Sequence, residues 1–178
     1  MLQSKRNAMT ARLGLLILGA WVVPSMGWAK PWMGVEPGVT KRAEVIKKFG
    51  EPAKTLTQNG KETLAYLGKN GIKGTSQAQF KVDAATGVVE RIDVFPGPVV
   101  AKDAVEATYG WQCGSPEAAK EPTAPCYVKK LTDDFRTYFM YVPLGIAVFF
   151  SEDTKTVHSF IFQPVKPATV APASSRQP

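Results

Sequence analysis

The sequence predicts an α+β protein made of two tandem repeats, in which one or two helices precede an antiparallel sheet and all helices lie on one face of the sheet. Two observations lead to this fold class. A short helix-like segment occurs twice, and a strand-turn-strand segment also occurs twice, in the same order. Segments that recur in the same order along the chain are the signature of a duplicated unit. The predicted repeats are residues 30–97 and 98–163.

The helix-like segment opens each copy. Residues 39–50 align without gaps on residues 99–110. They match at a central valine, an aromatic residue and a closing glycine, in the pairs Val45 and Val105, Phe49 and Tyr109, and Gly50 and Gly110. In the first copy Thr40 is suited to cap the helix, and Gly50 is suited to end it in the left-handed conformation.

Three extended runs follow the helix in each copy. They are residues 62–67, 77–83 and 88–95 in the first copy, and residues 136–142, 146–151 and 157–163 in the second. In each run the residues at alternate positions are mostly apolar, as expected of a strand with one buried face. Short polar turns join the last two runs of each copy, so each copy is expected to end in an antiparallel meander.

The two ends of the chain have a different composition. Residues 1–29 have the order of an export signal: basic residues first, then an apolar run from Leu13 to Val23, then Gly-Trp-Ala at the end. A bilayer core needs about 20 apolar residues, so we expect a signal peptide that is cleaved after Ala29. Residues 164–178 contain four prolines and no aromatic residue, which predicts a disordered tail.

The charge does not favour a nucleic-acid partner. The net charge is +7, but five of the 22 basic residues lie in the two ends and leave 17 against 15 acidic residues in the body. Those five are Lys5, Arg6, Arg12, Lys166 and Arg176. Phosphate binding needs a concentrated basic face, and a body with a net charge of +2 does not predict one.

Residues 35–52, Val-Glu-Pro-Gly-Val-Thr-Lys-Arg-Ala-Glu-Val-Ile-Lys-Lys-Phe-Gly-Glu-Pro, resemble the opening of the outer-membrane assembly lipoproteins of the SmpA/OmlA type. Two such units in tandem resemble the architecture of the β-lactamase inhibitory proteins, whose halves share a concave sheet. The resemblance covers most of residues 34–163 and implies a protein-binding role in the cell envelope. The second copy lacks the Gly-Val-Thr and Gly-x-Pro elements. No cysteine follows the apolar run of residues 13–23, so we expect no lipid anchor.

Cys113 and Cys126 lie in a predicted insertion, residues 111–130. An even number of cysteines in an exported chain predicts a disulfide, which would stabilise a loop of this size by about 3 kcal/mol. The spacing is not Cys-x-x-Cys, and the one histidine, His158, has no companion ligands nearby in the sequence. We therefore expect no redox site, no metal and no cofactor.

Strand parity predicts two different faces. The core face holds apolar residues in both copies: Leu64, Tyr66, Phe80, Val82, Ile92, Val94, Phe139, Tyr141, Val148, Phe150, Phe160 and Phe162. The opposite face is also apolar in the second copy, and we predict a protein-binding site there made of Phe95, Tyr138, Met140, Phe149 and Ile161. Two interpretations stay open, because exposed apolar patches are typical of interaction sites but the insertion or the tail could cover this one.

No catalytic motif of the Gly-x-Ser-x-Gly, His-Glu-x-x-His, P-loop or dinucleotide-binding type occurs. The function expected is that of an exported, non-catalytic protein, periplasmic or secreted, that binds another envelope or secreted protein through the open sheet face. Outer-membrane assembly or envelope maintenance is the process that the resemblance implies, with no nucleic-acid partner and no transmembrane segment after signal cleavage. The alternative is a secreted inhibitor of a protease or β-lactamase. A third hypothesis is an unrecognised hydrolase that uses His158.

Overall fold

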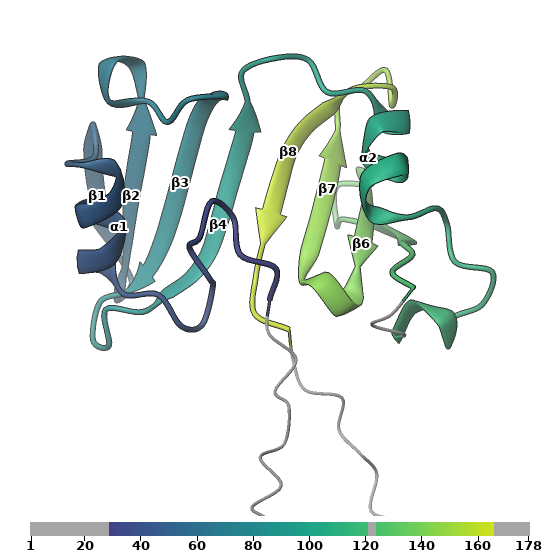
Figure 1. The fold of residues 1–178 in the computed structure, drawn as a ribbon, viewed down its shortest axis with the longest axis horizontal. Coiled ribbons are helices and arrows are strands. Elements are labelled where there is room, and N and C mark those ends of the chain that lie inside the picture. The colour runs from purple at the N-terminus through teal and green to yellow at the C-terminus, as the bar shows by residue number, and fades with distance from the viewer. Residues whose placement is uncertain (1–28, 121–123, 166–178) are drawn as a thin grey trace, which may run out of the picture.

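The computed structural model describes residues 29–120 and 124–165, which form one eight-stranded antiparallel sheet and two short helices (Figure 1). The strand order is β1-β2-β3-β4-β8-β7-β6-β5. The strands are β1 (Lys54–Gln58), β2 (Lys61–Leu67), β3 (Thr75–Asp83), β4 (Val89–Pro96), β5 (Val128–Leu131), β6 (Thr137–Tyr141), β7 (Ile146–Phe150) and β8 (Val157–Phe162). Helix α1 (Arg42–Phe49) precedes β1, and helix α2 (Lys102–Tyr109) precedes β5. Single 3-10 turns occur at Gly68–Asn70, Ala118–Lys120 and Val142–Leu144.

The predicted fold class, α+β with two tandem helix-and-sheet repeats, is wrong, because the protein is mainly β. All eight strands belong to one sheet, and each of the two helices has only eight residues. A glycine with positive φ follows each helix, Gly50 at 79° and Gly110 at 108°, and this conformation ends a helix. The second helix that the sequence interpretation allowed in each copy is absent from the described residues, where the insertion contains only the 3-10 turn at Ala118–Lys120.

Two strands were missed, β1 and β5, and both lie at the edges of the sheet. All five residues of β1 are exposed, so it has no buried face to give the sequence an apolar period. A turn signal was present nevertheless. Asn59 and Gly60 have φ of 51° and 70°, as a two-residue hairpin turn between β1 and β2 requires. Strand β5 begins inside the predicted insertion, at Val128.

The two halves of the sheet meet at β4 and β8. Only three residue pairs join these strands: Ile92 with Phe162, Asp93 with Ile161, and Val94 with Phe160. Each half on its own is a meander of four strands linked by sequential antiparallel pairs. The short β4–β8 ladder therefore makes one continuous surface from two meanders.

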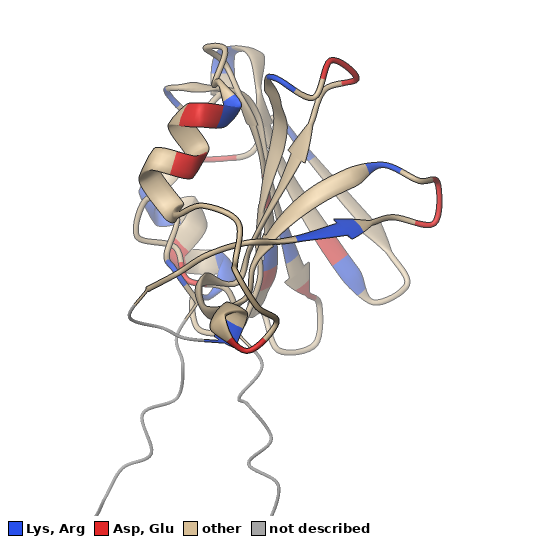
Figure 2. Ribbon diagram, turned by 90° about the vertical axis from the view of Figure 1, so that its right-hand side faces the viewer, with Lys and Arg blue, Asp and Glu red and all other residues tan. Residues whose placement is uncertain are grey.

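Both helices lie on the same side of the sheet (Figure 2). Each buries its central valine, Val45 in α1 and Val105 in α2. Behind each helix, a buried tyrosine donates a hydrogen bond of 2.9 Å to the carbonyl of the closing glycine, Tyr66 to Gly50 and Tyr141 to Gly110. These bonds satisfy carbonyl groups that a helix end leaves without partners. Thr40 does not cap α1 as predicted, because Lys41 is the cap residue and its N–H donates to Glu44 at 2.7 Å.

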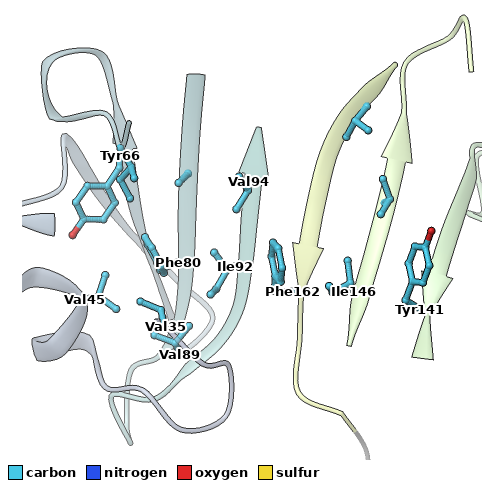
Figure 3. Packing of buried hydrophobic residues seen from close by; sticks show 14 of the residues in the cluster. Val35, Val45, Tyr66, Phe80, Val89, Ile92, Val94, Tyr141, Ile146 and Phe162 are labelled. Atoms are coloured by element: carbon cyan, nitrogen blue, oxygen red, sulfur yellow. The ribbon is translucent and has the colours of Figure 1, made fainter. Parts of the chain in front are cut away.

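The predicted core face is confirmed. Its members are buried or pack against the buried cluster, which runs across both halves of the sheet (Figure 3). Trp32, in the segment before α1, bridges the halves. Its ring centroid lies 6.2 Å from that of Phe49, 5.9 Å from that of Phe80 and 6.5 Å from that of Phe162. The segment thus fills the space over the β4–β8 junction that neither helix covers (Figure 1).

The insertion packs on the helix side of the sheet. The ring of Tyr127 stacks on Phe139 with centroids 3.7 Å apart, and its hydroxyl donates to the buried carboxylate of Glu106 in α2 at 2.7 Å. Burial raises the pKa of Tyr127, and the hydrogen bond to Glu106 raises it further. The predicted disulfide between Cys113 and Cys126 is present, with the two Cα atoms 5.0 Å apart. It ties the chain after α2 to the chain before β5.

The described chain begins and ends at one rim of the sheet. The N–H of Lys30 donates to the carbonyl of Leu144 at 3.0 Å, and the N–H of Gln163 donates to the carbonyl of Gly145 at 2.9 Å. The predicted signal peptide, apart from Ala29, and residues 166–178 of the predicted tail lie outside the described residues. Among the described helices, none is long and apolar enough to cross a membrane.

The position of Trp32 predicts a large effect on stability. The substitution Trp32→Ala should lower the free energy of unfolding by about 3 kcal/mol, because it removes contacts to both halves of the core. Urea denaturation followed by circular dichroism measures this loss. Trp111, which is 64% exposed, is the matched control, and Trp111→Ala should change the free energy by less than about 0.5 kcal/mol. Equal effects of the two substitutions would contradict the bridging role.

The disulfide closes a loop with a sequence separation of 13. Replacing both cysteines by serine should lower the free energy of unfolding by about 3 kcal/mol, because the unfolded chain gains the freedom that the bridge removes. Urea titrations of the double variant and of the oxidised protein give the difference. A variant as stable as the oxidised protein would show that the loop is held without the bridge.

Candidate binding face

The side of the sheet opposite the helices is called the open face below. The strand registers place apolar and charged residues on it, beside uncharged polar ones such as Thr63 and Gln79. The apolar members are Leu56, Ala65, Leu67, Phe95, Val128, Tyr138, Met140, Ala147, Phe149 and Ile161. The charged members are Lys54, Lys61, Lys81, Asp83, Glu90, Arg91, Asp93 and Lys130. All five residues of the predicted site belong to this face.

Four of the five predicted residues form a cluster on the second half of the face. Tyr138 and Phe149 are paired across β6 and β7, and their rings are stacked with centroids 4.8 Å apart. In the next row, Met140 and Ile161 lie on either side of the small residue Ala147. The four larger side chains are half-buried, so each still presents surface to solvent. We call Tyr138, Met140, Phe149 and Ile161 the apolar cluster.

Phe95 lies beside the cluster and makes a different contact. Its ring meets the ring of His158 edge-on, with centroids 5.6 Å apart. The pairing of β7 with β8 shifts register between Phe149 and Phe150, and the exposed side chain of His158 lies at this irregularity. Period-two counting along β8 gives His158 the parity of the core face, but the side chain is exposed because the ladder is irregular at this point.

A buried carboxylate lies at the centre of the open face. The side chain of Asp93 in β4 is only 8% exposed. It accepts a hydrogen bond of 2.5 Å from Arg91 and forms an ion pair with Lys81 at 3.1 Å. Its partner across the β4–β8 ladder is Ile161. A buried charge requires such partners. Asp93, Arg91 and Lys81 therefore form one polar unit, which borders the apolar cluster at Ile161. Sequence reasoning assigned them to this face but did not foresee their contacts.

The described part of the insertion does not cover the open face. Tyr127 stacks on Phe139, whose side chain points to the helix side, and Glu106 of α2 binds the Tyr127 hydroxyl. Of the two coverings considered from the sequence, the insertion therefore does not cover the open face: its described residues before β5 pack on the helix side, and residues 128–130 belong to the edge strand β5. The apolar cluster keeps its partial exposure.

A groove of 490 Å³ opens beside the cluster. Residues of β4, β5, β6 and the chain end line it, among them Glu90, Arg91, Lys130, Met140, Gly145 and Gln163. Gly145 has a φ of 63°, and a Cβ there would lie 2.2 Å from the carbonyl oxygen of Gln163. The glycine thus lets the chain pass close behind the groove. Sequence reasoning missed Lys130, because its face is defined only once β5 is known to be a strand.

In the described parts of the chain, no group of three or more His, Cys, Asp or Glu side chains could hold a metal ion. The chemistry that the open face does offer is apolar contact, ring stacking and positive charge. These are the means by which protein interfaces are built, with buried aromatic and arginine side chains at their centre.

Comparison with known proteins assigns no family. No family model matches the chain, and no curated protein matches it. Among solved structures, the chain is similar to a cysteine-rich secretory protein from Staphylococcus aureus, at 12% sequence identity and a TM-score of 0.34. The match covers 70% of this chain and 42% of that chain, so this chain spans less than half the length of that protein. A likeness of this degree carries no argument about function.

The contacts of Asp93 predict a specific sensitivity. Asp93→Ala should lower the free energy of unfolding by about 1–2 kcal/mol, since it leaves two neighbouring cations without their shared carboxylate while both can still be hydrated. Urea denaturation at low and high salt measures the loss, which should shrink with salt as repulsion between the cations is screened. Glu90→Ala is the control, because Glu90 pairs with the exposed Lys61. A similar loss for both variants would contradict the central role of Asp93.

Proposed function

We propose that this chain is an exported, non-catalytic protein of the cell envelope that binds another protein through the open face of its sheet. The observation that supports this most strongly is the apolar cluster. Tyr138, Met140, Phe149 and Ile161 come from three adjacent strands and are partly exposed together. Rigid strands hold such side chains in place before binding, so little conformational entropy is lost when a partner docks.

The proposal places the protein in an oxidising compartment outside the cytosol. The Cys113–Cys126 disulfide fits an exported protein, because disulfides persist outside the cytosol. The finer assignment, periplasm or secretion after removal of residues 1–29, is part of the proposal. So is the resemblance of residues 35–52 to the outer-membrane assembly lipoproteins, from which a role in envelope assembly or maintenance follows.

Inhibition of an enzyme by the same face is the second candidate. The apolar cluster and the neighbouring Arg91 would serve an inhibitor in the same way as they would serve a scaffold. Assays of protease and β-lactamase activity with added purified protein discriminate the two functions. An inhibitor suppresses hydrolysis at nanomolar to micromolar concentration, whereas a scaffold does not.

The proposal predicts the effect of one charge in the cluster. Phe149→Asp should abolish recovery of the partner by crosslinking in native envelopes, because a carboxylate at the centre of the cluster is costly to desolvate. The loss in unfolding free energy should stay near 1 kcal/mol, the scale of the lost stacking on Tyr138.

The same substitution at Phe135 is the control. Phe135 is 83% exposed and follows the acidic pair at the tip of the β5–β6 hairpin, which projects away from the layer of helices (Figure 2). Phe135→Asp should leave partner recovery intact. Recovery of the same partner by Phe149→Asp at wild-type yield would reject the site.

A further inference from the structure

We propose that the segment bound by the open face is acidic as well as apolar, with its apolar side chains on the apolar cluster and a carboxylate at Lys130 and Arg91. This inference rests on the proposed function, since it names the chemistry of the partner that the same face would bind. It follows from three features of the face: its charge, the position of the groove, and the charge of the other possible occupants.

The open face has an excess of positive charge. On its described strands lie five lysine or arginine residues and three carboxylates. Each carboxylate already has a cation: Asp83 and Glu90 bind Lys61, and Asp93 binds Lys81 and Arg91. Among the described residues, no carboxylate lies within 4.0 Å of the ammonium groups of Lys54 or Lys130. The charge available to a ligand on this face is therefore positive.

The groove brings this charge to the apolar cluster. Lys130 on β5 and Arg91 on β4 both line it, and in the strand order Met140 of the cluster lies between them. The one carboxylate in its lining, Glu90, is paired with Lys61. The amide of Gln163 also lines the groove, with its nitrogen 4.0 Å from the sulfur of Met140. When a side chain of the ligand packs on Met140, the adjacent residues of the ligand would therefore lie near two cations, Lys130 and Arg91, and the amide of Gln163. Carboxylates are the complementary groups, because charge-assisted hydrogen bonds are stronger than neutral ones.

The positive charge of the open face disfavours two other occupants, the C-terminal segment of this chain and a second copy of the chain. The C-terminal segment leaves the described chain at Val165, which lines the groove, but it carries Lys166 and Arg176 and no acidic residue. A second copy docked face to face would bring together two surfaces that each carry an excess of positive charge. Like charges at an interface are destabilising. An acidic segment of another protein would meet neither of these charge repulsions.

Selection from a library of random peptides displayed on phage tests the partner chemistry without knowledge of the partner. The purified, oxidised protein is the bait, and Phe149→Asp is panned in parallel. Sequences that enrich on the wild-type protein alone should combine aromatic or aliphatic residues with an excess of Asp and Glu. Enriched sequences that need Phe149 but are neutral or basic would overturn this inference and leave the proposed function standing. Enrichment that is the same on both baits, or no enrichment, would contradict both.

The selected peptides then give a quantitative test by fluorescence anisotropy. Lys130→Glu should weaken binding about fivefold or more, and added salt should weaken binding to the wild-type protein. The control is Lys47→Glu, which makes the same change in net charge on the exposed surface of α1, on the other side of the sheet; its affinity should stay within about twofold of wild type. Equal weakening by both substitutions would overturn the site at Lys130.

Deletion of residues 166–178 separates the tail from the partner as occupant. The truncated protein should bind the selected peptide with the same affinity as the full chain, within about twofold. A gain of tenfold or more would mean that the tail competes for the groove, which would overturn the assignment of this surface to a foreign acidic segment.

Discussion

Three residue pairs between β4 and β8 hold this structure together as a single sheet. Without them the chain would be two four-stranded meanders, each with an unprotected edge. The junction is reinforced on both sides. On the helix side Trp32 contacts Phe80 from one half and Phe162 from the other. On the other side, Asp93 sits at the ladder itself and gathers Lys81 and Arg91 around it.

The two faces of the sheet differ because of this arrangement. The helix side is closed by α1, by α2 with its disulfide-bridged insertion, and by the segment around Trp32 between them (Figure 1). No described segment covers the other side, where the polar unit of Asp93 meets the apolar cluster. If the proposed function is correct, an apolar, rigid and positively charged surface would bind a partner by packing and would disfavour partners that are themselves positively charged.

Period-two alternation was sufficient to predict much of this structure. It placed Tyr66, Phe80, Ile92 and Tyr141 in the core and Tyr138 and Phe149 on the opposite face, because side-chain direction in a strand depends only on local geometry. It failed for the edge strands, whose residues bury neither face, and at the irregularity beside His158. The fold class was wrong for another reason. The repeated segments predicted two helix-and-sheet units, whereas all eight strands join in one sheet and each described helix has only eight residues.

The features that define the candidate site were less accessible to sequence reasoning. The grouping of Lys130, Arg91 and Met140 depends on strands far apart in the chain becoming neighbours through β8, and no local pattern encodes that order. Lys30 and Gln163 both bond to the turn that ends at Gly145, so the described chain enters and leaves the sheet at the same rim. A label attached at residue 30 or at residue 163 would therefore hold the folded sheet from that one rim.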